Sequence, residues 1–290
     1  MARQTTPSAF GPSPYSPSTR VERGPGGEVV VLLALLLCLG GTALAQDDMP
    51  PGPPLFPETV HFHPRGDDGI TLEGILSSPV QAPQIAPGAV ICHPHPLYGG
   101  TMDNGVTRGL EQALLKQGLI TLRFNFRGVG ASTGKFSGKG GEVQDALGAL
   151  DFLLSRPNLD RKRVGLVGYS FGSWVGLEAA VKEQQRLKFY AGVGFPVGPD
   201  TVDFGPARFI EPAKLPMLFV SGEQDTISSI PKIERLLVLT RLTKLAKVVG
   251  LPGVDHFYGG KDDIAAMQKI VVDFVKPILW PVKPDPAVGG

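Results

Sequence analysis

Apolar runs and amphipathic segments alternate along most of the chain from Thr59 onward. Two early segments, "TVHFHP" and "ITLEGILSSP", flank the turn-rich "RGDDG", a pattern that predicts an antiparallel hairpin. The later runs are continuously apolar, which is typical of strands buried on both faces of a parallel sheet. These later runs are "GAVICHP", "LITLRFNF", "RVGLVGY", "FYAGVGFP", "PMLFVSG" and "AKVVGLP".

Helical patterns separate most of these runs. One apolar stripe ends before Gly118 and another before Pro157, as helices do when glycine or proline follows. The stripes consist of Val106, Leu110, Ala113 and Leu114, and of Val143, Leu147, Leu150 and Leu154. The segment "AAMQKIVVDFVKPIL" supplies a last helix. This alternation predicts one α/β domain over residues 59–279, with about eight mostly parallel strands and helices on both faces of the sheet.

The first 58 residues differ in composition from the rest. Residues 1–28 are rich in Pro, Ser, Gly and Thr and have no apolar period, which predicts a disordered extension. Residues 29–45 are apolar and end in Ala-Leu-Ala, the pattern of a signal peptide. The uninterrupted apolar part is shorter than the ~20 residues that a spanning helix needs, so we expect no stable membrane anchor. Residues 46–58 have the composition of a Pro-rich linker, and residues 280–290 that of a flexible tail.

The signal-like segment leaves two localisations open. Cleavage after Ala45 would export the protein to the periplasm or the medium, with Gln46 as its first residue. Translation from Met49 would omit the apolar segment and leave the protein in the cytoplasm.

Charge and cysteine content exclude several classes of protein. The 290 residues are 42% hydrophobic and carry a formal net charge of +1, as in an ordinary globular protein. Because no basic cluster accompanies this charge, we expect no nucleic-acid partner. The two cysteines, Cys38 and Cys92, are too few for a disulfide framework.

The candidate chemistry begins with "GYSFG", which places Ser170 between Gly168 and Gly172. The serine lies at the end of a predicted strand and the start of a predicted helix, the setting of a nucleophile elbow. So sharp a turn brings the flanking positions close together, and glycine at both avoids a clash of Cβ atoms. The alternative is a tight strand-to-helix turn with an idle serine.

A serine hydroxyl needs a base, and the base needs an orienting acid, before it becomes a useful nucleophile. Asp225 follows the predicted strand "PMLFVSG" and His256 follows "AKVVGLP". Because the carboxyl ends of parallel strands meet at one edge of a sheet, we expect both to converge on Ser170. His256 is the only histidine after Ser170, whereas Asp225 has four competitors, namely Glu223, Asp200, Asp203 and Asp255.

Acyl transfer also needs hydrogen-bond donors for a developing oxyanion. The backbone N–H of Phe171, directly after the serine, is the first candidate. The second should come from the loop "HPHPLYGG", in which the two prolines have no N–H to donate. His95 and Leu97 remain, and we favour His95.

Histidine pairs in the sequence suggest a second interpretation, a zinc site. The pairs are His61 with His63, and His93 with His95. Since no nearby carboxylate or cysteine cluster completes a ligand set, we predict no metal and no other cofactor. The imidazoles of His93 and His95 are expected to brace their loop by hydrogen bonds.

Five motifs together resemble the α/β-hydrolase superfamily, above all the small bacterial hydrolases called dienelactone hydrolase-like or serine esterase-like. They are "ICHPHPLYGGTMDN", "LRFNFRGVGAS", "VGYSFGSW", "SGEQD" and "GVDHF". The resemblance spans Thr59 to Ile278 and implies the α/β-hydrolase fold, with Ser170, Asp225 and His256 as catalytic triad.

Further implications of the resemblance concern the loops and the substrate. It makes the segment from His93 to Gly100 the oxyanion loop, and Arg127 part of a structural turn. It also implies a cytoplasmic protein. True dienelactone hydrolases use a cysteine nucleophile where this chain has Ser170, so their lactone substrate does not carry over.

The substrate can be bounded by what separates the predicted strands. About twenty residues lie between the sixth strand and the next, too few for a cap domain. We therefore expect an open, shallow pocket lined by Tyr98 and Phe195, together with Leu97, Phe171 and either Phe204 or Phe209. The expected substrate is a small carboxylic ester, with thioesters or small amides as variants. The alternative is a non-catalytic protein of the same fold that binds a ligand or a partner. We do not expect a peptidase, because the sequence supplies neither a lid nor a charged anchor for a peptide terminus. The natural substrate and the oligomeric state are left open.

Overall fold

The structure is a computed structural model that describes residues 57–79, 85–138, 140–197, 213–239 and 245–281. All of these residues belong to one compact unit. The predicted disordered extension and signal-like segment lie outside the described residues, as do nearly all of the predicted linker and all of the predicted flexible tail after Pro281. So do Phe204, Phe209 and most of the segment after the sixth strand, on which the prediction of no cap domain depends.

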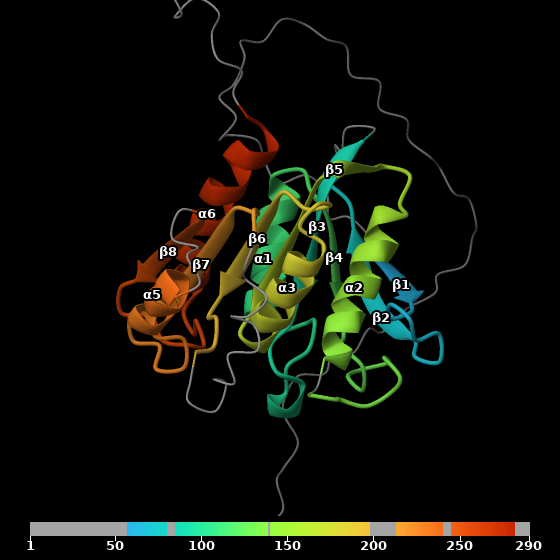
Figure 1. Cartoon of the computed structure of the whole chain (residues 1–290), viewed down its shortest axis with the longest axis horizontal. Coiled ribbons are helices and arrows are strands. Elements are labelled where there is room, and N and C mark those ends of the chain that lie inside the picture. Colours follow the sequence, from blue (N-terminus) through green and yellow to red (C-terminus); the bar gives the residue numbers. More distant parts are fainter. Residues whose placement is uncertain (1–56, 80–84, 139, 198–212, 240–244, 282–290) are drawn as a thin grey trace, which may run out of the picture. The chain divides into compact units, whose positions relative to one another are not determined.

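A single sheet forms the centre of the domain (Figure 1). Its strands are β1 (Glu58–Phe62), β2 (Leu72–Ser77), β3 (Ala86–Cys92), β4 (Ile120–Phe124), β5 (Leu159–Tyr169), β6 (Phe189–Val193), β7 (Met217–Gly222) and β8 (Ala246–Leu251). The eight strands lie in the order β1-β2-β4-β3-β5-β6-β7-β8. β1 pairs antiparallel with β2 and β2 with β4, and all other pairs are parallel. The predicted hairpin and the predicted mostly parallel sheet are confirmed. The first strand begins at Glu58, one residue before the predicted start of the domain.

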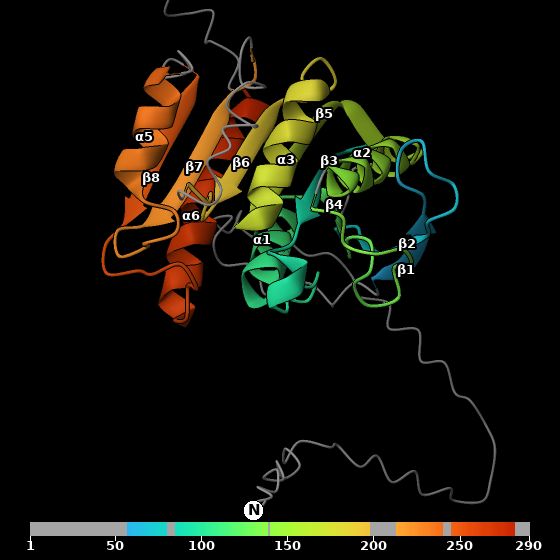
Figure 2. The ribbon, with the colours of Figure 1, turned by 60° about the horizontal axis from the view of Figure 1, so that its bottom comes forward.

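Helices cover both faces of this sheet, as Figure 2 shows. They are α1 (Gly105–Lys116), α2 (Gly141–Leu154), α3 (Phe171–Lys182), α5 (Ile230–Leu239), α6 (Lys261–Leu279) and the short 3₁₀ helix η1 (Pro96–Tyr98). α1 and α6 pack on one face, whereas α2, α3 and α5 pack on the other. No helix among the described residues has both the length and the apolar character to cross a membrane.

Two hydrophobic cores result, one on each face of the sheet. Neighbouring residues of one strand serve both, as Leu166 and Val167 of β5 show, because successive strand residues point to opposite faces. The predicted stripes of α1 and α2 are buried in these cores. The expectation of burial on both faces is wrong for β8, where only Leu251 is buried. β8 is an edge strand with a neighbour on one side only, so most of its side chains remain accessible.

The turn from β5 to α3 requires glycine at two positions. A Cβ at Gly168 would overlap the carbonyl group of Gly172, as the sequence predicts. A Cβ at Gly172 would overlap the carbonyl oxygens of Cys92 and His93 at the end of β3. The start of α3 therefore packs backbone to backbone against the neighbouring strand, and this contact places the helix N-terminus.

These contacts predict opposite effects for two glycine substitutions. Gly168→Ala should lower the free energy of unfolding by about 3 kcal/mol, because the new methyl group meets rigid backbone. Gly176→Ala should leave stability unchanged or raise it by up to about 1 kcal/mol, since alanine favours the helix and its Cβ would lie 3.6 Å from the ring of Tyr190, an ordinary contact. Urea unfolding measures both. Equal losses of stability in the two variants would contradict the role assigned to the turn.

Candidate active site

Ser170 occupies a strained backbone position between β5 and α3. Its φ is 51° and its ψ is −124°, a left-handed conformation that residues with a side chain rarely adopt. The surrounding backbone holds it there: its N–H donates to the carbonyl of Val193 in β6 at 2.8 Å, and its own carbonyl accepts from Ser173 at 2.8 Å. The side chain is thereby lifted out of the strand at the carboxyl edge of the sheet.

Three side chains from separate loops meet at this edge. Oγ of Ser170 lies 2.9 Å from Nε2 of His256. Nδ1 of the same imidazole lies 2.8 Å from Oδ2 of Asp225. Asp225 comes from the loop after β7 and His256 from the loop after β8, and both are buried. The convergence expected from the sequence is therefore present as a continuous chain of hydrogen bonds.

Asp225 is held as a carboxylate. Its burial opposes ionisation, but hydrogen bonds from His256 and from the N–H of Ser228 outweigh burial and lower the pKa of the carboxyl group. Oδ1 accepts from the N–H groups of Ser228 and Ile227 at 2.7 and 2.9 Å. Since an ionised Oδ2 can only accept, Nδ1 of His256 carries the proton and Nε2 is free to accept from the serine.

The competing acids point elsewhere. Glu223 is exposed, and Asp255 is exposed with its Oδ1 accepting from the N–H of Phe257 at 2.8 Å. Asp200 and Asp203 lie outside the described residues. Asp225 is thus the candidate acid that the described part of the chain brings to the imidazole. The hydroxyl of Ser228, which the sequence analysis missed, lies 3.4 Å from the same Nδ1.

Two backbone donors near the serine are left unused. The N–H of Phe171 lies in the first turn of α3, and the N–H of His95 lies in the loop after β3; neither donates to another described residue. The proposal of Leu97 as an oxyanion donor is contradicted, because its N–H donates to Nδ1 of His95 at 3.2 Å. That bond caps η1 and leaves His95 as the available donor of the pair.

His93 fixes the loop after β3 by hydrogen bonds of its imidazole, as expected. Its Nε2 accepts from the N–H of Phe126 at 3.1 Å, so Nδ1 carries the proton and donates to the carbonyl of Pro94 at 2.6 Å. Complete burial lowers the pKa of the imidazole to about 4, and the ring stays neutral near pH 7. In the other histidine pair, Nδ1 of His63 donates to the carbonyl of Ile70 at 2.7 Å. Among the described residues, no group of three or more histidine, cysteine or carboxylate side chains is arranged to hold a metal ion.

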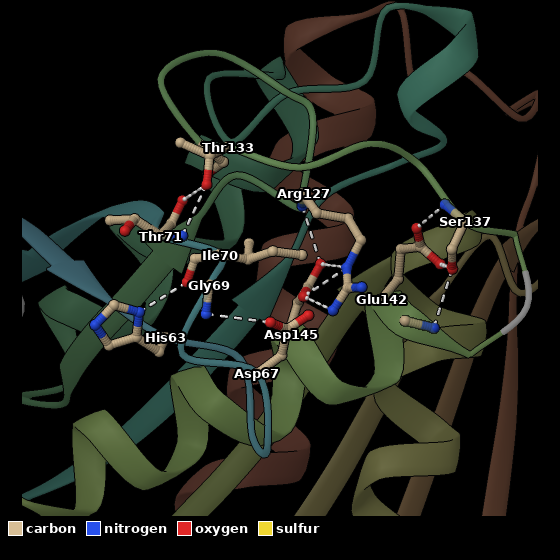
Figure 3. Close-up of polar contacts among 12 residues, drawn as sticks. His63, Asp67, Gly69, Ile70, Thr71, Arg127, Thr133, Ser137, Glu142 and Asp145 are labelled. Carbon is tan, nitrogen blue, oxygen red and sulfur yellow. Dashed lines mark hydrogen bonds and ion pairs between the residues drawn. The ribbon is translucent and has the colours of Figure 1, made fainter.

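The loop between β4 and α2 is fastened at both ends (Figure 3). Arg127 binds Asp145 through its backbone N–H and its guanidinium group, with its Nη2 atom 2.7 Å from Oδ1. Further along, the N–H and the hydroxyl of Ser137 both donate to the carboxylate of Glu142, at 2.6 and 2.9 Å. The expectation that Arg127 is structural is confirmed, because its guanidinium group forms an ion pair with Asp145 of α2.

This fastened loop presents an aromatic ring that the sequence analysis missed, Phe136. Its ring centroid lies 4.9 Å from that of His95 and 5.7 Å from that of Phe171. Tyr98, predicted to line the site, is 87% exposed, with its ring 4.8 Å from that of His95. These four residues form an aromatic group beside the nucleophile. A lone aromatic residue in a polar, glycine-rich loop was the available signal for Phe136.

The prediction that Phe195 lines the substrate site is wrong. Only 2% of it is exposed, and its ring packs 5.3 Å from that of Phe219 in the hydrophobic core. It therefore supports the sheet and is not available to a substrate.

Comparisons with known proteins identify the family of this fold. The Dienelactone hydrolase family model matches residues 131–270, and the model for X-Pro dipeptidyl-peptidase (S15 family) matches residues 68–193. An uncharacterised protein of Rickettsia prowazekii is 33% identical over 196 residues, which are 66% of this chain and 79% of that protein. A protein of unknown function from Agrobacterium tumefaciens, named as a candidate α/β hydrolase, has a TM-score of 0.66 at 31% identity, covering 79% of this chain and 100% of the other. The chain belongs to the α/β-hydrolase superfamily.

One further relative of this α/β hydrolase is informative. A protein from Xanthomonas campestris, named as a member of the α/β serine hydrolases without a lid, is 26% identical. It has a TM-score of 0.64, with 80% of this chain and 100% of the other covered. The fold and the family together support a hydrolase activity of the serine type.

The buried imidazole of His93 predicts a pH dependence of stability. Its pKa in the folded α/β hydrolase is about 4, below the value of about 6.5 expected in the unfolded chain. Between these values the unfolded chain binds a proton that the folded chain does not, so stability falls by about 3 kcal/mol as pH drops through this window. His93→Gln retains an acceptor for the N–H of Phe126 without titrating. Denaturant unfolding over the same pH range should give a flatter dependence for this variant, and identical slopes would contradict the assignment.

Proposed function

We propose that the protein is a serine hydrolase that cleaves small carboxylic esters through an acyl-enzyme. The single observation that carries the proposal is the unbroken hydrogen-bond chain from Ser170 through His256 to Asp225, with 2.9 and 2.8 Å between the paired atoms. A protein that merely binds a ligand has no chemical need for a strained serine, an aligned imidazole and a buried carboxylate at one point.

The first half of the reaction uses each member in turn. Nε2 of His256 takes the proton from Oγ of Ser170 while Oγ attacks the carbonyl carbon of the ester. The carboxylate of Asp225 stabilises the imidazolium that forms, and keeps its ring oriented. Collapse of the tetrahedral intermediate breaks the bond to the alcohol oxygen, which receives the proton from Nε2. The acyl group then remains on Oγ.

In the second half, Nε2 removes a proton from a water molecule that attacks the acyl carbonyl. Collapse of this second intermediate breaks the bond to Oγ, which recovers the proton from Nε2, and the carboxylic acid leaves. In both halves the negative oxygen would accept hydrogen bonds from the N–H groups of Phe171 and His95. The positive end of α3, aimed at the same place, adds to this stabilisation.

The substrate class follows from the surroundings of Ser170. The lidless relative supports an open site, and the aromatic group formed by His95, Tyr98, Phe136 and Phe171 supplies an apolar surface of limited extent. Small apolar acyl groups, as esters or thioesters, suit such a site. Peptide hydrolysis is a second candidate, favoured by the match to the dipeptidyl-peptidase model, although that match ends at residue 193, before Asp225 and His256.

A fluorophosphonate probe tests the catalytic assignment. We expect the unmutated protein to be labelled and Ser170→Ala to remain unlabelled, because the probe reacts only with an activated serine. His256→Gln should slow labelling by about a thousandfold or more, since the base is lost. Ser155→Ala is the matched control, because within the described part of the chain this hydroxyl donates to the carbonyl of Phe152 in the last turn of α2 and lies in no catalytic loop. Absence of labelling in the unmutated protein would favour a binding role.

A panel of substrates tests the proposed class. Among p-nitrophenyl esters from acetyl to palmitoyl, kcat/KM should be highest at the short acyl chains, because an open and shallow site buries little of a long chain. Dipeptidyl arylamides form the second arm of the panel. An optimum at long chains, or faster cleavage of the arylamides, would replace the proposed ester class with a lipid ester or a peptide.

A further inference from the structure

Tyr169, the residue directly before the nucleophile, makes a hydrogen bond that the proposed reaction does not use. Its hydroxyl donates to the backbone carbonyl of His256 at 2.8 Å. The side chain is 4% exposed, and its ring centroid lies 5.8 Å from that of the imidazole at an angle of 31°. Burial raises the pKa of the phenol, so the hydroxyl remains a donor throughout the neutral and mildly alkaline range.

Gly194 lies beside both the imidazole of His256 and the phenol ring of Tyr169. A Cβ at Gly194, directly after β6, would lie 3.2 Å from Cε1 of His256 and 3.3 Å from Cε2 of Tyr169. The φ of Gly194 is 55°, so the chain turns away at this point and leaves room for both rings. The Tyr169 ring and Gly194 therefore limit the movements of His256 on two sides.

The loop that carries His256 needs such a restraint. Two residues later, Tyr258 adopts a φ of 52°, which is strained for a residue with a side chain. It is 1% exposed, its hydroxyl donates to the carbonyl of Val220 at 3.3 Å, and its ring packs at 85° against that of Tyr169. Strained backbone persists only where its surroundings determine it. Here the surroundings of Tyr258 include the carbonyl of Val220 and the buried ring of Tyr169.

Within the described residues, the carbonyl of His256 accepts a hydrogen bond from Tyr169 and from no other group. We infer that Tyr169 is a positioning residue that sets the distance between nucleophile and base, through its peptide bond to Ser170 and its hydrogen bond to His256. Small displacements of reacting groups cost large factors in rate. The link through Tyr169 joins the backbone of the nucleophile to the backbone of the base by a single buried hydrogen bond. The inference rests on the proposed function, because it assumes that proton transfer from Ser170 to His256 limits turnover.

Tyr169→Phe removes the one hydroxyl and keeps the ring. We expect kcat to fall about tenfold, as for the loss of one hydrogen bond, while KM changes by less than about twofold. The rate of fluorophosphonate labelling should fall in the same ratio, because it depends on the same proton transfer. A purely structural tyrosine would change the melting temperature without this separation of kcat from KM.

The chain supplies a matched control in Tyr190→Phe. Tyr190 is also buried, and its hydroxyl also donates to a backbone carbonyl, that of Ser173 at 2.6 Å. It has no contact with the loop of His256 among the described hydrogen bonds. We expect the control to lose stability as Tyr169→Phe does, while it retains the kcat of the unmutated enzyme.

The outcomes separate the two proposals. If the unmutated protein is not labelled, the proposed function fails. If it is labelled and Tyr169→Phe turns over at the rate of the control, the function stands and the positioning role is overturned. Hydrogen exchange at residues 252–258 adds a second measurement, because loss of the restraint should speed exchange there and leave the control unchanged.

Discussion

The backbone contact between Gly172 and the end of β3 is the constraint on which the site depends. Without a Cβ at this position, the first turn of α3 rests against the carbonyl groups of Cys92 and His93. The N–H of Phe171 and the loop that carries His95 are consequently brought together by main chain, with no dependence on side-chain rotamers. Backbone contacts therefore join the nucleophile, the N-terminus of α3 and the loop after β3, and the loops of Asp225 and His256 lie against them.

Much of this arrangement was predictable from sequence because it follows from local rules and from topology. Periodicity identified the strands and helices, and the glycines around Ser170 identified a sharp turn between them. The order of Asp225 and His256 after two apolar runs placed both at the carboxyl edge, since parallel strands leave no other place for the residues that follow them.

The errors occur where direction or partnership depends on distant atoms. Gly194 has a positive φ, which breaks the alternation along β6 and turns the ring of Phe195 inward. Leu97 loses its free N–H to a side chain of its own loop, a contact that no pattern encodes. Phe136 lies in a segment without hydrophobic periodicity, so no pattern indicates which way its ring points. Tyr169 resembles any other buried strand residue in the sequence, because its hydrogen-bond partner His256 lies 87 positions away along the chain.

The strained backbone at Ser170 has a consequence for how this protein balances durability against reactivity. A left-handed residue with a side chain costs about 1–3 kcal/mol, a substantial share of the roughly 5–15 kcal/mol by which most domains resist unfolding. Glycine would relax that conformation but would carry no hydroxyl. The residue that carries the reactive hydroxyl therefore also lowers the stability of the fold locally. Contacts from β3, β6 and α3 maintain a backbone conformation that an isolated serine would not adopt.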